Sequence, residues 1–254
     1  MSKIKSYFDN HAHHYAYHTD PSFYLSIISS IQKIKPGERI KVLDVGCGDG
    51  SFIKSMVMTG IDANIIGTDV SLSMINIAKK NLNYPRVELF LADAFKLPLK
   101  SESKFDLIHI DSVLHHLIGN TKYQSMSLVK RMLKVLSDRL SENGVLVIEE
   151  VHYVSYIKPT ITSSIIFYGL KLLNLLHLDI SRIMKEFQPG LEVNFLYDKE
   201  IEKLLEQYGT VRLIKKDLLK KIPRLYQFFL VKEVGYISHM VTASPIHEQY
   251  KLSS

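Results

Sequence analysis

Short, continuous apolar runs alternate with helix-like segments through the middle of the chain. Apolar runs of this kind are typical of strands buried on both faces of a parallel sheet. We expect strands at 40–45, 63–69, 87–91, 105–111 and 145–151, and helices at about 51–59, 71–81 and 123–141. Ser71 is a plausible N-cap, and Gly144 is expected to close the last helix before its strand. The pattern predicts βαβ units and an α/β fold with helices on both faces of the sheet.

The rhythm breaks after the fifth expected strand. Residues 153–184 are mainly aliphatic and aromatic, and Pro189 and Gly190 follow them and indicate a turn or loop. We therefore expect a helical lid inserted at 153–190. Its most apolar part, 161–180, is interrupted by polar residues and is too polar for an unaided transmembrane helix.

The last part of the chain returns to the α/β pattern. A charged amphipathic helix is expected at about 198–207, followed by two antiparallel edge strands at 211–214 and 226–231. With these the sheet has seven strands, most of them parallel. The tail from 235 to 254 shows only weak periodicity.

Composition fits one globular domain of the cytoplasm. The chain has 254 residues, of which 46% are hydrophobic and 23% charged, close to globular averages. Cys47 is the only cysteine, so the chain can form neither an internal disulfide nor a cysteine cluster for zinc. No apolar run suited to a signal peptide follows the basic N-terminus. We expect a single domain over 1–254, without a metal site.

The net charge of +6 is spread along the chain, and only 212–224 is locally basic. A solvated face explains that segment better than a phosphate-binding site. We therefore do not expect nucleic acid as a partner. The oligomeric state stays open.

A glycine-rich loop follows the first expected strand, at Asp44-Val45-Gly46-Cys47-Gly48-Asp49-Gly50. Glycines between a strand and a helix permit positive φ and a close approach of a ligand to the backbone, where helix amides donate hydrogen bonds. A dinucleotide fingerprint needs G-x-G-x-x-G, whereas Ser51 occupies the position of its third glycine. The loop favours a nucleoside ligand over NAD, although a merely structural turn remains an alternative.

Two further acids stand at strand ends. Asp69 ends the second expected strand, where a carboxylate can accept both hydroxyls of a ribose, and Asp93 follows the third. With Asp44 they place three carboxylates at successive strand ends, the edge at which open α/β sheets bind ligands. Any single one of them could merely cap a helix.

These residues resemble the class I S-adenosylmethionine-dependent methyltransferases over about 7–150, with a weaker likeness at 195–233. The resemblance rests on the glycine loop, on the acidic turn at 67–71, on Ala92-Asp93-Ala94 and on the strand and turn at 105–117. It implies a Rossmann-like core, S-adenosylmethionine as cofactor and a methyltransferase activity. It also implies that 1–35 forms a helical cap over the cofactor.

By this resemblance Asp69 would hold the ribose, Asp93 the adenine N6, and Gly46 and Gly48 the methionine moiety. The positions expected to contact the cofactor are Tyr15, Asp44, Gly46, Cys47, Gly48, Asp69, Val70, Met74, Asp93, Ala94, Phe95, Asp111 and Ser112.

His115 and His116 follow the fourth expected strand, at the rim where the methyl group should be presented. A neutral imidazole suits a general base near neutral pH. We expect one of them to be catalytic, while packing or hydrogen bonding in the turn is an equally strong alternative.

The leading function is methyl transfer to a small, apolar or aromatic acceptor. An RNA or protein methyltransferase and a non-catalytic module that binds the cofactor are the alternatives. The lid is expected to wall the acceptor side, but its aliphatic residues could equally extend the core or form a dimer interface. A third possibility is peripheral contact with a membrane.

Overall fold

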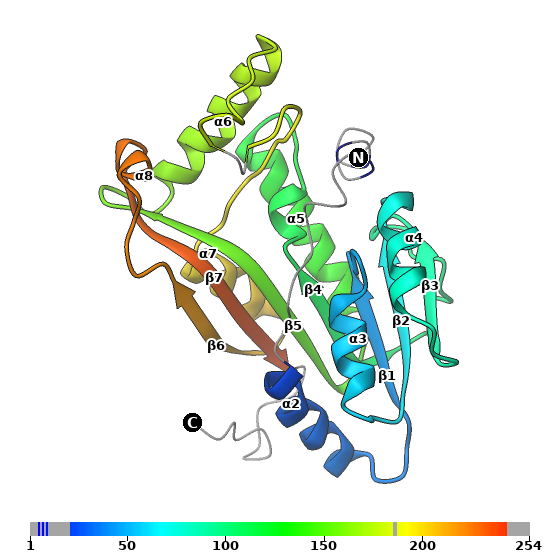
Figure 1. Ribbon diagram of the computed structural model, residues 1–254. Coiled ribbons are helices and arrows are strands. Elements are labelled where there is room, and N and C mark those ends of the chain that lie inside the picture. Colours follow the sequence, from blue (N-terminus) through cyan, green and yellow to red (C-terminus); the bar gives the residue numbers. More distant parts are fainter. Residues whose placement is uncertain (1–4, 6, 8, 10–20, 185–186, 243–254) are drawn as a thin grey trace.

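The computed structural model describes residues 5, 7, 9, 21–184 and 187–242, which build one layered α/β body (Figure 1). Its centre is a seven-stranded sheet in the order β3-β2-β1-β4-β5-β7-β6. The strands β1 to β5 pair in parallel, and β7 pairs antiparallel with β5 and with β6. The predicted seven-stranded, mostly parallel sheet of a Rossmann-like fold is confirmed. The strands are β1 (Ile40–Val45), β2 (Ala63–Asp69), β3 (Val87–Leu91), β4 (Phe105–Asp111), β5 (Leu140–Ser155), β6 (Thr210–Leu218) and β7 (Val231–Thr242).

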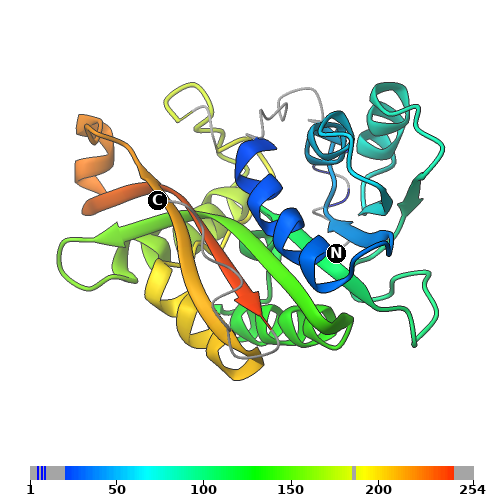
Figure 2. The same ribbon diagram turned by 90° about the horizontal axis from the view of Figure 1, so that it is seen from below.

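Helices cover both faces of this sheet (Figure 2). They are α2 (Pro21–Ile34), α3 (Ser51–Met58), α4 (Leu72–Asn81), α5 (Lys122–Ser137), α6 (Ile161–Leu175), α7 (Asp198–Leu205) and α8 (Arg224–Phe228), with short 3-10 turns η2 (Leu114–His116) and η3 (Glu206–Tyr208). Ser71 caps α4 as predicted, since its side chain accepts a hydrogen bond from the Met74 amide.

Successive residues of the central strands serve opposite cores, which explains their unbroken apolar runs. On β1, Val42 belongs to the cluster formed with α2, α3 and α4, whereas Leu43 and Val45 belong to the cluster formed with α5 and α7. This two-sided burial fixes the register of the sheet and sets the carboxyl ends of β1, β2 and β4 side by side.

The boundary between the third predicted helix and its strand was wrong. The helix α5 ends at Ser137 rather than 141, and β5 begins at Leu140 and continues to Ser155. Gly144 lies inside this strand and closes no helix. A Cβ at this position would lie 2.8 Å from the Phe105 carbonyl oxygen, so glycine here allows a close approach of β5 to β4.

The last predicted strand was also misplaced. Residues 226–228 lie in α8, and the strand that follows, β7, runs through 231–242, most of which had been assigned to the weakly periodic tail. It is not an edge strand, because it lies between β5 and β6. Burial on both faces removes the polar alternation that would have revealed it, and Gly235 interrupts the apolar run where Asp217 approaches closely.

The expected insertion begins with the end of β5 and contains α6. A third apolar cluster packs this helix and the returning segment 187–195 on the ends of β5 and β7. Of the expected cap at 1–35, the structure describes α2 and three isolated positions. One of these, Asp9, accepts hydrogen bonds from the Ser71 hydroxyl at 2.7 Å and the Ser73 amide at 3.2 Å, at the start of α4.

Candidate active site

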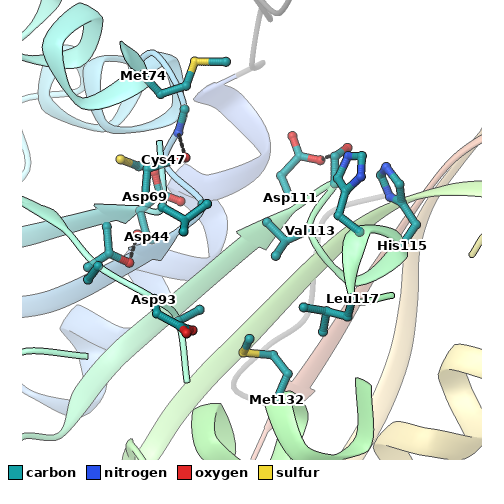
Figure 3. Close-up of a pocket in the computed structure, with 18 of the residues that line it drawn as sticks. Asp44, Cys47, Asp69, Met74, Asp93, Asp111, Val113, His115, Leu117 and Met132 are labelled. Atoms are coloured by element: carbon teal, nitrogen blue, oxygen red, sulfur yellow. Dashed lines mark hydrogen bonds between the residues drawn. The ribbon is translucent and has the colours of Figure 1, made fainter. Parts of the chain in front are cut away.

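One cavity of about 590 Å³ opens at the carboxyl ends of β1, β2 and β4, a volume typical of small-ligand sites. Every site position expected from the sequence lines it except Tyr15, which lies outside the described residues. Figure 3 shows Asp44, Cys47 and Asp69 on one side of the hollow and Asp111 and His115 on the other. The expected positions along the wall are Asp44, Gly46, Cys47, Gly48, Asp69, Val70, Met74, Asp93, Ala94, Phe95, Asp111, Ser112, His115 and His116.

The glycine loop is fastened to the neighbouring strand. The amides of Gly46 and Cys47 both donate to the Thr68 carbonyl oxygen, at 2.7 and 2.9 Å. Gly46 and Gly48 have φ angles of +75° and +54°, which side chains adopt with strain. A Cβ at Gly46 would lie 2.3 Å from the Val113 side chain, whereas a Cβ at Gly48 would meet nothing within 4 Å. Gly48 thus leaves backbone open at the cavity wall for a ligand to approach.

The acids at the ends of β2 and β3 are held by backbone amides. Asp69 accepts from the Gly48 amide at 3.0 Å with one oxygen and from the Ser71 amide at 2.8 Å with the other. Asp93 accepts from the Phe95 amide at 2.8 Å, and the Arg131 guanidinium lies 4.5 Å from the Phe95 ring centre. Burial raises the pKa of Asp69. Both carboxylates are therefore oriented before any ligand binds.

A buried histidine links Asp44 to β5 beneath the cavity. His109 lies within hydrogen-bond distance of Asp44 through Nδ1, at 2.7 Å, and of Glu149 through Nε2, at 3.2 Å. Its ring stacks on Phe52 at a centroid distance of 3.8 Å. Burial acts to lower the pKa of His109, but the two carboxylates raise it to about 10. His109 is therefore an imidazolium between two carboxylates at neutral pH.

Tyr24 extends this chain of contacts to α2. Its hydroxyl donates to Glu149, which also accepts from the Ser238 hydroxyl at 2.7 Å. Burial acts to raise the pKa of Glu149, but its hydrogen bonds with His109, Tyr24 and Ser238 hold it at about 2. Elements that are distant in the sequence thus converge behind His109, which lines the cavity.

The end of β4 carries a strained residue and a buried acid. Ser112 has φ +54°, a left-handed conformation that is uncommon outside glycine. Its backbone amide donates a hydrogen bond to the Glu149 carbonyl oxygen at 2.9 Å, which holds it in this conformation. Its hydroxyl donates to Asp111 at 2.7 Å. Burial, with Glu149 nearby, raises the pKa of Asp111 to about 7.

A histidine–carboxylate pair lies at the opposite end of the cavity. His115 Nδ1 is 2.6 Å from Glu150 Oε2, and the other Glu150 oxygen accepts from the Leu114 amide at 2.6 Å. Burial raises the pKa of Glu150 to about 8 and lowers that of His115 to about 3. The Phe195 ring, 5.2 Å from that of His115, limits how the imidazole can turn. One ring nitrogen is thus fixed by Glu150, which leaves Nε2 for proton transfer.

His116 lines the same end of the cavity and packs 4.0 Å from His115, ring centre to ring centre. Burial, followed by the charge of His115, lowers its pKa well below the ordinary value. The returning segment closes this region, because the Asn194 amide donates to the His115 carbonyl oxygen at 2.8 Å and Gly190 and Glu192 line the wall.

Comparison with known proteins identifies the domain. Residues 42–137 match the family described as "Methyltransferase domain". The YcgJ protein of Bacillus subtilis, 15% identical, has the same fold, with a TM-score of 0.56 over 88% of this chain and 100% of that one. Residues 42–137 therefore form a methyltransferase domain, and the chain has the fold of the class I S-adenosylmethionine-dependent methyltransferases.

This methyltransferase is also similar to one curated protein in sequence and to another solved structure in fold. It is 33% identical to a malonyl-[acyl-carrier protein] O-methyltransferase of Legionella pneumophila over an alignment of 90 residues. This alignment covers 35% of this chain and 31% of that protein. Magnesium protoporphyrin IX methyltransferase from Synechocystis, solved with bound SAH, has a TM-score of 0.51 at 14% identity over 94% of this chain and 99% of that one. The methyltransferase spans 31%, 48% and 59% of the length of the first curated relatives that it matches.

The cavity suits the cofactor of this family on its own structural evidence. Among the described residues, the buried Asp44 Oδ2 has no hydrogen-bond partner, so it is free to accept from a cationic ligand. The acids of the wall, Asp44, Asp49, Asp69 and Asp93, outnumber its cations, Lys96 and Arg131, which favours a ligand carrying both an ammonium and a sulfonium. The open backbone at Gly48 provides the space that such a ligand needs.

Sequence reasoning missed three residues of the methyltransferase site, His109, Glu149 and Glu150. Their signal is a charged or polar residue inside an otherwise apolar strand, as at His109 in 105–111 and at the end of the fifth run. Such residues are almost never left without a partner when buried. For metals, no group of three or more His, Cys, Asp or Glu within the described ranges could hold an ion.

Replacing Asp69 by alanine is expected to weaken S-adenosylmethionine binding. Buried ribose hydroxyls would lose a charged acceptor, a loss on the order of 1.5 to 3 kcal/mol. Calorimetric titration of the variant measures it. The exposed Asp62, outside the cavity lining, provides a matched control, and Asp62→Ala should bind as the parent does. Unchanged affinity in Asp69→Ala would overturn the assignment.

Replacing His109 by glutamine is expected to lower the free energy of unfolding by about 2 kcal/mol, because the amide can hydrogen-bond but carries no charge between the two carboxylates. In the folded protein the pKa of His109 is raised from 6.5 to about 10. The contribution of the charged imidazole to the free energy of unfolding is therefore fully present below pH 6.5 and is lost as the pH rises through about 10. Urea unfolding of both proteins across this range should show the difference shrinking at alkaline pH. A difference that grows with pH would contradict a charged His109.

Proposed function

We propose that the chain transfers a methyl group from S-adenosylmethionine to a hydroxyl oxygen of a small acceptor with an apolar or aromatic body. The observation that carries this proposal is that His115 lines the same cavity as the residues proposed to hold the cofactor and lies 2.6 Å from the buried Glu150. A hydroxyl must lose its proton as it is methylated, and a fixed imidazole can accept that proton.

The cofactor would be held by Asp69 at the ribose, Asp93 at the adenine N6, and Asp44 with Gly46 and Gly48 at the methionine moiety. Phe95 and Met132 wall the adenine end. S-adenosylmethionine supplies an electrophilic methyl group on a cationic sulfur. The task of the protein is then mainly to align the acceptor oxygen and exclude water.

His115 would act as the base through Nε2. While Glu150 is protonated, it donates to Nδ1, so Nε2 carries the hydrogen and cannot accept another. Once Glu150 is ionised, Nδ1–H donates to the carboxylate and Nε2 accepts the proton of the hydroxyl as the oxygen–carbon bond forms. Glu150 is therefore a positioning residue, which acts on the acceptor only through His115.

The lid at 153–190 is proposed to wall the acceptor side. Support comes from Gly190 and Glu192, which line the cavity, and from the apolar cluster in which the Phe195 and Tyr153 rings pack with their centres 4.5 Å apart, next to His115. The helix α6 itself contributes to that cluster rather than to the cavity wall. Cys47 is a buried free thiol, in line with our proposal of a cytoplasmic location.

The pH dependence of methyl transfer separates a hydroxyl acceptor from a carboxylate. A carboxylate is already ionised at neutral pH and needs no base. For a hydroxyl, kcat should rise with pH and level off above about 8, because ionisation of Glu150, whose pKa is about 8, frees Nε2. Glu150→Gln should remove this limb, since burial alone keeps the pKa of His115 at about 3.

Transfer of tritiated methyl from the cofactor to a panel of phenols, fatty hydroxy acids and carboxylic acids measures the activity and identifies the acceptor for the pH profile. Methylation of phenols or hydroxy acids with that profile supports the proposal. A pH-independent rate between about 6 and 9, or methylation of carboxylates alone, contradicts it. Binding of the cofactor without transfer to any acceptor would favour a non-catalytic module.

A further inference from the structure

The helix α6 is apolar on two opposite faces, and only one of them is covered. Ile166, Phe167 and Leu170 are buried against the body. On the other face, Tyr168 is 53% exposed, Leu172 56% and Leu175 74%. Residues spaced by three and four lie on one side of a helix, so these side chains form a continuous stripe. A stripe of this kind left in solvent marks an interaction site.

Exposed apolar residues continue around α6. Tyr156 and Ile157 precede it and Phe228 belongs to α8, with exposed fractions of 65%, 67% and 85%. The Tyr156 amide donates to the Leu230 carbonyl oxygen at 3.0 Å, and the Thr162 hydroxyl to that of Phe229 at 2.8 Å, so these segments adjoin. Figure 1 shows α6 and α8 at the same end of the molecule. We call the exposed side of 156–178 and 219–228 the α6 face.

The charge of the α6 face is mainly positive. Residues 153–178 and 218–232 contain no aspartate or glutamate. Within them are six cationic residues, namely Lys158, Lys171, Lys220, Lys221, Arg224 and Lys232. Lys171 pairs with Glu192 at 3.0 Å and Lys232 lies 3.9 Å from Glu233, which leaves Lys158, Lys220, Lys221 and Arg224 to give the face its positive charge. A second copy of the chain would bring the same positive charge to this face, which disfavours self-association. An exposed apolar stripe beside lysines matches a surface that has hydrocarbon beneath negative head groups.

We propose that the α6 face docks on a bilayer of anionic phospholipids. The apolar stripe would lie at the boundary between head groups and acyl chains, and Lys220, Lys221 and Arg224 would contact the lipid phosphates. Contact of this kind is peripheral: within the part of the chain that the structure describes, no helix is long and apolar enough to cross a membrane. The proposal concerns binding alone and stands apart from the methyl transfer proposed above.

Flotation of the full chain with lipid vesicles tests this docking. The chain should float with vesicles of phosphatidylcholine and phosphatidylglycerol and far less with phosphatidylcholine alone. The double variant Leu172→Asp, Leu175→Asp should bind the mixed vesicles on the order of tenfold more weakly, and so should Lys220→Glu, Lys221→Glu. Met58→Asp, which replaces a side chain 73% exposed on α3, and Lys79→Glu, Lys80→Glu on α4 are the matched controls and should float as the parent does.

The melting temperature and the affinity for S-adenosylhomocysteine, measured for each variant, show whether the protein remains folded. Failure of the parent to float, or equal flotation of the α6-face variants and the controls, overturns the proposal. Light scattering of the parent and of the leucine variants measures their oligomeric state. If the leucine variants convert a dimer to a monomer while flotation is unchanged, the face is a subunit interface and the lipid proposal is wrong.

Discussion

Replacing Gly48 by valine is expected to abolish cofactor binding. Gly48 has φ +54°, and its Cβ position meets nothing within 4 Å on the wall of the cavity. A branched side chain would both strain the loop and occupy the space through which a ligand reaches the backbone. The expected loss is at least about 3 kcal/mol, or roughly a hundredfold in the dissociation constant for S-adenosylhomocysteine, measured by calorimetry.

Gly60→Val separates the strain from the obstruction. Gly60 has φ +76° and equally open space around its Cβ position, but it lies at the end of α3 and outside the cavity lining. The control should therefore lose stability without losing affinity. If Gly48→Val binds as the parent does, the loop is only a structural turn.

Replacing His115 by glutamine should lower kcat by about two to four orders of magnitude. The glutamine amide can still donate to Glu150, but it cannot take a proton from the acceptor. Affinity for the cofactor should change little, because its proposed contacts lie elsewhere along the cavity. Single-turnover transfer of labelled methyl, with calorimetry as the binding control, measures the two quantities separately.

His116→Gln is the matched control for this experiment. His116 adjoins His115 and lines the same cavity, but it is less buried, and the 2.6 Å contact with Glu150 is made by His115. We expect a smaller loss of kcat than in His115→Gln. If the order is reversed, His116 is the base, and the role assigned to Glu150 is lost with it.

Much of this site could be predicted because it consists of local sequence patterns. Strand-to-turn spacing alone predicts the glycine loop and the acids Asp44, Asp69 and Asp93 at or just after the ends of their strands. The parallel pairing of β1 and β2 then brings Asp44 and Asp69 to the same edge of the sheet. The apolar runs also predicted the bounds of the first four strands.

The contacts beneath the site could not be predicted in the same way. His109 binds Asp44 and Glu149, which lie 65 and 40 residues away in the sequence, and the Tyr24 hydroxyl bonds to Glu149 across 125 residues. Only the assembled sheet brings these side chains into contact. The strand β7 escaped detection for a related reason, because a strand buried between β5 and β6 has no polar alternation.

Titration of the full chain with S-adenosylmethionine and with its demethylated product tests most directly whether this cavity is a methyl-donor site. We expect one molecule bound per chain with a dissociation constant in the micromolar range, and a large loss of affinity in Gly48→Val. A folded protein that binds neither compound, or one that binds both with the same affinity after the Gly48→Val change, would contradict the assignment.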